Sequence, residues 1–178
     1  MRTTRATGRA RARTTLAPLA ALCALITTGC ASAPAPTMSK QDAHADVLVF
    51  LERWSAAIAE RNDDAIRAAY APGDRLRWFE DGALRYRSAD EVLDALRQFP
   101  EWARIHTELT DVVTEPLCDR FISGSASFRT RISMSGSGFE FSGVFTMLLE
   151  RSDGRWMFVT GHTSTRGDTP ELPPELPH

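Results

Sequence analysis

The sequence has few cysteines and none of the short motifs that mark nucleophile or cofactor sites. Of its three cysteines, Cys23 and Cys30 lie near the N-terminus and Cys118 lies alone in the body of the chain, so we expect no disulfide within the folded domain. The sequence has no phosphate-binding loop, no nucleophile elbow and no C-x-x-C pair. Its four histidines are scattered rather than spaced as metal ligands. We therefore expect neither a metal nor another cofactor, and a core that is stabilised by packing alone.

The sequence also lacks an apolar run of comfortable membrane-spanning length. An arginine-rich leader without acidic residues precedes an apolar run over residues 16–26, which is too short to cross a bilayer. The following Thr27-Thr28-Gly29-Cys30 resembles a bacterial lipobox, in which the chain is cut before a cysteine that becomes diacylated, although leucine is usual where Thr27 stands. We expect residues 1–29 to be a lipoprotein signal peptide and Cys30 to be lipidated.

These features place the protein outside the cytoplasm. The lipoprotein interpretation predicts a membrane-anchored protein that faces the periplasm or the cell exterior. The alternative is an ordinary secretory signal that is cut after Ala33, which would release a soluble secreted protein. We expect a Pro/Ala tether over residues 30–38, one domain over residues 39–166, and a disordered Pro-rich tail over residues 167–178.

A surplus of basic residues is absent as well. The whole chain has 21 Lys and Arg against 23 Asp and Glu, but five of the arginines lie in the leader. Removing the leader leaves 16 basic and 23 acidic residues, a formal net charge of −7. An acidic chain without a basic stripe argues against nucleic acid as a partner and against attraction to anionic membranes. Membrane contact is therefore expected through the lipid on Cys30.

The first half of the domain is predicted to hold three helices. Ser39 and Asp42 resemble a capping box at the start of a helix that ends near Arg61. Its apolar face is formed by Val47, Phe50, Leu51, Trp54 and Ile58. Asn62 begins a short second helix, and a capping box of Ser88 and Glu91 begins a third, which Pro100 ends.

The remainder is predicted to be sheet. Two short strands flank a turn at residues 80–82, and four long strands follow the third helix, with a turn expected over residues 116–119. The connections between the long strands are too short for crossovers, so these strands must be antiparallel. The predicted fold class is α+β: a cone-shaped α+β roll in which three N-terminal helices pack on a curved, mostly antiparallel sheet.

The last two strands form a hairpin over residues 139–164, with a two-residue loop at Asp153-Gly154. This loop predicts four cross-strand pairs: Arg151 with Trp156, Leu149 with Phe158, Met147 with Thr160, and Phe145 with His162. His162 would then share a face with Phe145 and Phe158. A three-residue loop would shift every pair by one position.

Residues spread over 47–164 resemble the nuclear transport factor 2-like superfamily, in its SnoaL-like branch of small bacterial proteins. The matching residues are Trp54, Ala57, Arg61-Asn62-Asp63, Ala65-Ile66, Tyr70-Ala71, Asp81-Gly82, Tyr86-Arg87-Ser88, Gly143, Thr146, Asp153-Gly154, Trp156 and His162-Thr163-Ser164. The resemblance implies a pocket inside the cone and dimerisation through the outer face of the sheet.

The same superfamily contains ketosteroid isomerases, dehydratases and epoxide hydrolases beside members without known chemistry, so the resemblance does not assign a reaction. The isomerase pattern requires a carboxylate base just after the first strand. Here Phe79 stands about where that base is expected, and Glu80 is one residue away. The acid of the next-to-last strand is absent from Val144-Phe145-Thr146, which argues against isomerase chemistry by that mechanism.

Three functions remain open. The first is binding of a small apolar or amphipathic ligand, without assignable chemistry, in a pocket formed by Trp54, Tyr70, Trp78, Phe145, Phe158 and His162. The second is an enzyme, isomerase-, dehydratase- or hydrolase-like, that uses His162 as acid or base together with Tyr70 or Glu80. The third is a protein-interaction module that dimerises through the sheet. Two alternative interpretations argue against the enzyme: that His162 is a core histidine, and that Glu80 is a solvated turn residue.

Overall fold

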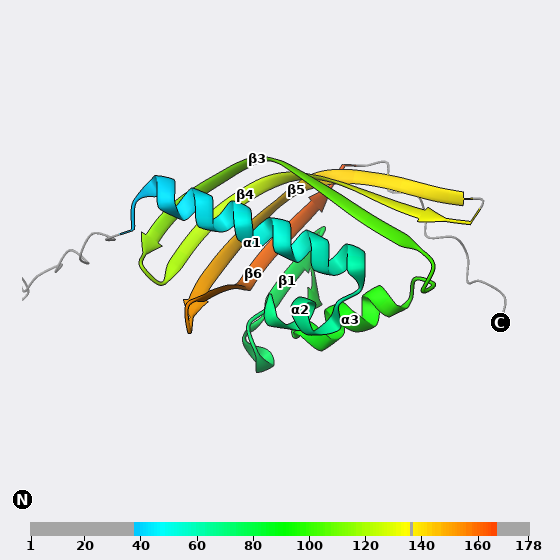
Figure 1. Cartoon of the computed structure of the whole chain (residues 1–178), viewed down its shortest axis with the longest axis horizontal. Helices are drawn as coiled ribbons and strands as arrows, with labels where there is room; N and C mark the ends of the chain where they lie inside the picture. Colours follow the sequence, from blue (N-terminus) through cyan, green and yellow to red (C-terminus); the bar gives the residue numbers. More distant parts are fainter. Residues whose placement is uncertain (1–37, 136, 167–178) are drawn as a thin grey trace, which may run out of the picture. The chain divides into compact units, whose positions relative to one another are not determined.

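The fold is a six-stranded curved sheet with helices on one face (Figure 1). The computed structural model describes residues 38–135 and 137–166. The predicted signal peptide, Cys30 and the tail from residue 167 lie outside these ranges. The elements are α1 (Lys40–Glu60), α2 (Asp63–Ala68), the 3-10 turn η1 (Gly73–Arg75), β1 (Arg77–Glu80), β2 (Ala83–Tyr86), α3 (Ala89–Arg97), β3 (Arg104–Cys118), β4 (Phe121–Met134), β5 (Ser137–Ser152) and β6 (Arg155–Thr165).

The strand order is β2-β1-β6-β5-β4-β3, and the sheet is unclosed. Only β1 and β6 pair in parallel within this sheet, so the prediction of a mostly antiparallel sheet in an α+β cone is confirmed. The long helix α1 lies across the sheet, and α2 and α3 lie near its C-terminal end (Figure 1). Among the described residues, no helix is both long and apolar enough to cross a membrane.

The predicted caps fix where the helices begin. The Ser39 hydroxyl accepts the Asp42 amide at 3.1 Å, the Asn62 side chain accepts the Ala65 amide at 3.1 Å, and the Ser88 hydroxyl accepts the Glu91 amide at 3.2 Å. Helix α1 ends at Glu60 because Arg61 adopts a left-handed conformation, with φ 54°. These caps set both ends of α1 and the first residues of α2 and α3.

An aromatic seam joins α1 to the last hairpin. Phe158 is fully buried, and its ring centre lies 4.9 Å from that of Phe50 and 5.4 Å from that of Trp54. Trp54 also lies 6.3 Å from Phe145. Large side chains buried in this way are each worth about 1.5–3 kcal/mol, so the seam contributes much of the packing between helix and sheet.

The two-residue loop of the last hairpin is confirmed, but the predicted register is only half right. Asp153 and Gly154 both have positive φ, and the pairs Arg151–Trp156 and Leu149–Phe158 form as predicted. A β-bulge then leaves Val159 unpaired, so that Met147 lies opposite Gly161 and Phe145 opposite Thr163. The predicted pairs of Met147 with Thr160 and of Phe145 with His162 are therefore wrong.

The bulge coincides with a change of partner along the other edge of β6. Before the bulge, Phe158 exchanges backbone hydrogen bonds of 2.8 Å with Ala69 and Ala71. After it, residues from Thr160 onward pair with β1. Because of the extra residue, β6 pairs with the segment after α2 before the bulge and with β1 after it. Every side chain of β6 beyond the bulge therefore lies on the face opposite to the one that an unbroken alternation predicts.

Strand β3 runs further than the sequence suggested. The turn expected over residues 116–119 is wrong, because Pro116 still pairs with Ile122 and the strand ends at Cys118. Strand β3 lies at the edge of the sheet, where a residue without an amide hydrogen is tolerated.

Candidate ligand-binding site

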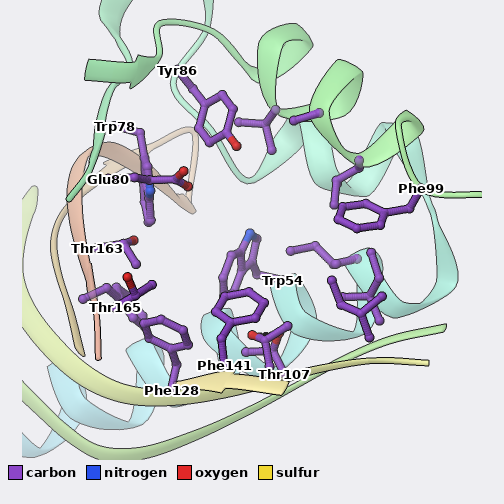
Figure 2. A pocket seen from close by; sticks show the side chains of 18 of the residues that line it. Trp54, Trp78, Glu80, Tyr86, Phe99, Thr107, Phe128, Phe141, Thr163 and Thr165 are labelled. Atoms are coloured by element: carbon purple, nitrogen blue, oxygen red, sulfur yellow. Dashed lines mark hydrogen bonds between the residues drawn. The ribbon is translucent and has the colours of Figure 1, made fainter. Parts of the chain in front are cut away.

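A cavity of about 370 Å³ lies inside the cone (Figure 2). Its walls come from the C-terminal half of α1, from α3, from the β1–β2 hairpin, and from the parts of β3 to β6 that face these helices. Most of the lining is aliphatic or aromatic: Trp54, Ile58, Tyr70, Trp78, Tyr86, Val92, Ala95, Leu96, Phe99, Ile105, Leu109, Phe128, Ile132, Phe139, Phe141 and Phe145. The polar remainder is Glu80, Asp81, Thr107, Thr130, Thr163 and Thr165.

Glu80 is the carboxylate that points into the cavity. It is the last residue of β1 rather than part of the turn, and its side chain is directed inward beside Trp78 and Tyr86 (Figure 2). Burial raises the pKa of Glu80 above its usual value, against the opposing effect of Arg85, whose Nε lies 3.7 Å from Glu80 Oε2. The expectation that Glu80 lies in the turn is therefore wrong, because Glu80 pairs with Ala83 and the turn consists of Asp81 and Gly82 alone.

Asp81 is held in place by β6. Its carboxylate accepts the Thr165 amide at 2.9 Å and the Thr165 hydroxyl at 2.7 Å, and its own amide donates to Thr163. The hydrogen bonds from Thr165 lower the pKa of Asp81 below its usual value. The hydrogen bonds of Asp81 thus join the β1–β2 hairpin to β6, whereas the side chain of Glu80 is directed to the cavity.

Two tyrosines bring hydroxyl groups to the wall. The Tyr70 hydroxyl accepts a hydrogen bond of 2.9 Å from Trp54 Nε1, and burial raises the pKa of Tyr70 far above its usual value. Burial also raises the pKa of Tyr86, and the charge of Glu80 adds to that rise. Both tyrosines therefore stay protonated and present hydrogen-bonding groups rather than negative charges.

The structure divides the residues predicted to form the site. Trp54, Tyr70, Trp78, Phe145 and Glu80 line the cavity. Phe158 does not, because it is fully buried behind Trp54 and Trp78. His162 is exposed on the outer face of the sheet, opposite Thr146 on β5 and beside Phe79 on β1, because the Val159 bulge reverses the expected alternation.

Several lining residues were not predicted. Thr163 and Thr165 take the inward positions that the unbroken alternation assigned to His162 and its face. Tyr86 ends β2 and Phe99 follows α3. Whether these two side chains reach the cavity wall depends on how α3 packs on the rest of the domain. Phe128, Thr130 and Ile132 were assigned to one face of β4, and the facing Phe139 and Phe141 follow the same two-residue period, which is the signal that could have identified them.

The site offers the inward-pointing carboxylate of Glu80, two phenols, several hydroxyls and many rings. This set suits binding of a small apolar molecule and transfer of a proton. No group of three or more His, Cys, Asp or Glu residues is arranged to hold a metal among the residues that the structure describes.

Comparison with known proteins supports the fold. The sequence profile of the SnoaL-like domain matches residues 47–166. No curated protein matches the chain. Similar solved structures include an NTF-2-like protein of unknown function from Shewanella oneidensis MR-1, which is 20% identical, with 67% of this chain and 97% of that chain covered and a TM-score of 0.54.

Two further similar structures have functional names. A hexachlorocyclohexane dehydrochlorinase (LinA) type 2 is 16% identical, with 75% of this chain and 92% of that chain covered and a TM-score of 0.59. The β subunit of benzoate 1,2-dioxygenase from Burkholderia mallei ATCC 23344 is 14% identical, with 70% and 91% covered and a TM-score of 0.60. At these identities the likeness shows the fold alone.

Proposed function

The chain belongs to the SnoaL-like family, and on that premise we propose that its domain binds a small, mostly apolar ligand that carries one polar group. The fold of this family often encloses a ligand-binding pocket, and here the cavity of about 370 Å³ supports that use. The observation that carries the proposal is the wall itself, which combines aromatic side chains with the inward-pointing carboxylate of Glu80.

The size of the cavity limits the ligand. Pockets that bind small molecules run from about 300 to 1,000 Å³, so this one lies at the small end of the range. A compound of one or two rings fits this volume. The rings of the wall suit a flat or cyclic ligand, and the polar group would face Glu80, Thr163 and Tyr86.

We further propose that the domain works outside the cytoplasm and is held to a membrane by lipid on Cys30. The order of basic leader, apolar run and Gly29-Cys30 supports this location. Dimerisation through the outer sheet face stays a prediction, and light scattering of the purified protein at several concentrations would test it.

Blocking the cavity tests the binding function. Ala95 lies on α3 in the cavity wall, so Ala95→Phe should fill the space. Ala45 is exposed on α1, and Ala45→Phe is the matched control. Native mass spectrometry of ligands that co-purify with the protein, followed by titration of its tryptophan fluorescence with them, should show binding to the wild type and to Ala45→Phe. Equal binding to Ala95→Phe would contradict the proposed site.

A second candidate is an enzyme that removes a proton from carbon, with Glu80 as the base. Its raised pKa and its place in an apolar cavity favour this role over His162, which lies outside. The fold similarity to a dehydrochlorinase is compatible with an elimination that begins in this way. The Tyr70 and Tyr86 hydroxyls would donate hydrogen bonds to the charge that develops on the substrate.

The test is exchange of deuterium from solvent into the acidic C–H position of a co-purified ligand. At a ligand concentration that saturates both proteins, Glu80→Gln should reduce exchange by at least about a hundredfold, within the usual contribution of a general base. His162→Ala should leave exchange unchanged, since that side chain is on the outer face. Exchange that depends on His162 and not on Glu80 would restore the assignment made from the sequence.

A further inference from the structure

We propose that the ligand of this cavity carries a positive charge, in the form of a hydrophobic ammonium group seated at Glu80. This inference rests on the proposed binding function and adds the charge of the ligand to it. It follows from the charges on the wall, from the surroundings of Glu80, and from the aromatic faces that fill the rest of the site.

The wall carries negative charge and no positive charge among the described residues. Its lining includes the carboxylates of Glu80 and Asp81, and contains no lysine, arginine or histidine. A low-dielectric cavity focuses the field of such charges on whatever enters it. An anionic ligand, such as a carboxylic acid at neutral pH, would therefore be repelled, and a cation would be attracted.

Glu80 lacks a strong partner for its charge. Arg85 approaches from β2 at 3.7 Å, but more than half of its side chain is exposed, and it lies outside the cavity. An exposed pair of this kind is worth little, because water screens it. Asp81 is engaged by Thr165, and its charge adds to the cost of ionising Glu80. A cation that enters the cavity would offset the desolvation that Glu80 already suffers.

The aromatic faces suit the alkyl groups around such a cation. Trp54, Trp78, Tyr70 and Tyr86 all contribute to the cavity, and the electron-rich faces of tryptophan and tyrosine attract ammonium groups. The guanidinium of Arg85 already lies 5.9 Å from the centre of the Tyr86 ring, which shows that this ring accepts a cation nearby.

The test compares two molecules that differ only in charge. Benzyltrimethylammonium and neopentylbenzene have the same shape, with nitrogen in the first replaced by carbon in the second. Isothermal titration calorimetry of the mature protein should give the cation an affinity at least about tenfold higher, which is 1.4 kcal/mol. If neopentylbenzene binds as well or better, the inference fails while the binding function stands. If neither binds, the proposed function fails with it.

Three variants locate the charge effect. Glu80→Gln keeps the shape of the side chain and should remove about tenfold or more of the affinity for benzyltrimethylammonium. Arg85→Gln removes the competing cation and should raise that affinity about two- to fivefold. Glu52→Gln removes one negative charge from the exposed face of α1 and should change nothing. Retained cation preference in Glu80→Gln, with folding verified by circular dichroism, would overturn the inference.

The pH dependence of the affinity for benzyltrimethylammonium gives an independent test of the inference. A quaternary ammonium does not titrate, so its affinity should rise with pH as Glu80 ionises, over a range shifted above that of an ordinary glutamate. Asp81, Arg85, Tyr70 and Tyr86 are the titratable groups that interact with Glu80, and His162 on the neighbouring strand β6 acts on Asp81. Asp81 titrates lower, and the two tyrosines and Arg85 titrate higher. A flat profile in the wild type would contradict the proposal.

Discussion

Gly161 makes room for one wall of the cavity. It lies opposite Trp78 across the β1–β6 pair, and a Cβ atom at this position would lie 2.4 Å from Trp78 Cζ3. The indole therefore rests directly on the backbone of β6, where it also contacts Phe158 with ring centres 5.3 Å apart. Any side chain at position 161 must displace the ring.

Gly161→Ala should destabilise the protein by about 1–3 kcal/mol, the usual cost of overpacking a core, and should weaken ligand binding because Trp78 moves. Urea unfolding with fluorescence detection would measure both effects, the second by titration of ligand. Ser164→Ala, on the outward side of the same strand, is the control and should stay within about 0.5 kcal/mol of the wild type. Unchanged stability of Gly161→Ala would show that the ring packs elsewhere.

The ionised form of Glu80 weakens the fold. Because burial raises its pKa, the folded protein holds the proton of Glu80 more tightly than the unfolded chain does. The ionised carboxylate therefore destabilises the fold at neutral pH, and this penalty disappears as the pH falls below the ordinary glutamate range. Glu80→Gln should raise the Tm at pH 7 by a small amount, on the order of 1–2 °C, because solvent reaches over a third of the side chain.

Scanning calorimetry at several pH values would measure this effect. The advantage of Glu80→Gln should be present at pH 7 and vanish near pH 4. A variant that is less stable than the wild type at pH 7 would mean that the contact with Arg85 outweighs burial.

Five of the seven residues predicted for the site line the cavity, and the other two, Phe158 and His162, do not. Trp54 and Tyr70 follow from the apolar pattern of α1 and the segment after α2, and Phe145 from the alternation of β5. His162 was misplaced because a bulge depends on which segments pair with both edges of β6, which local alternation does not record. Glu80 was undervalued because its Asp-Gly turn begins one residue later than the polar run suggests.

At the scale of elements, one buried carboxylate joins two turns to strand β5. Glu150 on β5 is fully buried and accepts hydrogen bonds from Arg75 of η1 and from Arg120 of the β3–β4 turn, with Arg120 Nε at 2.8 Å. Burial alone would raise the pKa of Glu150, but the two guanidinium groups more than offset it, so its pKa lies below the usual value. Both arginines are about half exposed.

Removing both arginines should cost more than removing the carboxylate. Arg75→Ala with Arg120→Ala leaves a buried, unpaired charge and should destabilise by about 3 kcal/mol or more. Glu150→Gln leaves two arginines that water can reach, so about 1–2 kcal/mol is expected. Chemical unfolding would measure the loss of stability in both proteins and show which loss is larger. Arg131→Ala, which breaks an exposed pair with Glu140, is the control and should cost under about 1 kcal/mol.

At the scale of the molecule, the lipid anchor is the prediction with the clearest readout. Cys30→Ser removes the sulfur that the acyl chains require, so the protein should move from the membrane fraction to the soluble fraction. Cys118→Ser is the control, because that cysteine lies within β3 and should leave the distribution unchanged. Membrane association that survives Cys30→Ser would mean that the chain is not held by lipid at this residue.

Helix α1 separates the N-terminal end of the described chain from the cavity. The described chain begins beside the β3–β4 turn, where the Met38 amide donates to Asp119 at 3.0 Å, while Trp54 lies fourteen residues beyond Lys40. At 1.5 Å per residue that is about 21 Å along the helix. If the chain is tethered at Cys30 as proposed, we expect this length of helix to keep the cavity apart from the point where the described chain begins, so that a ligand reaches the cavity without passing the tether.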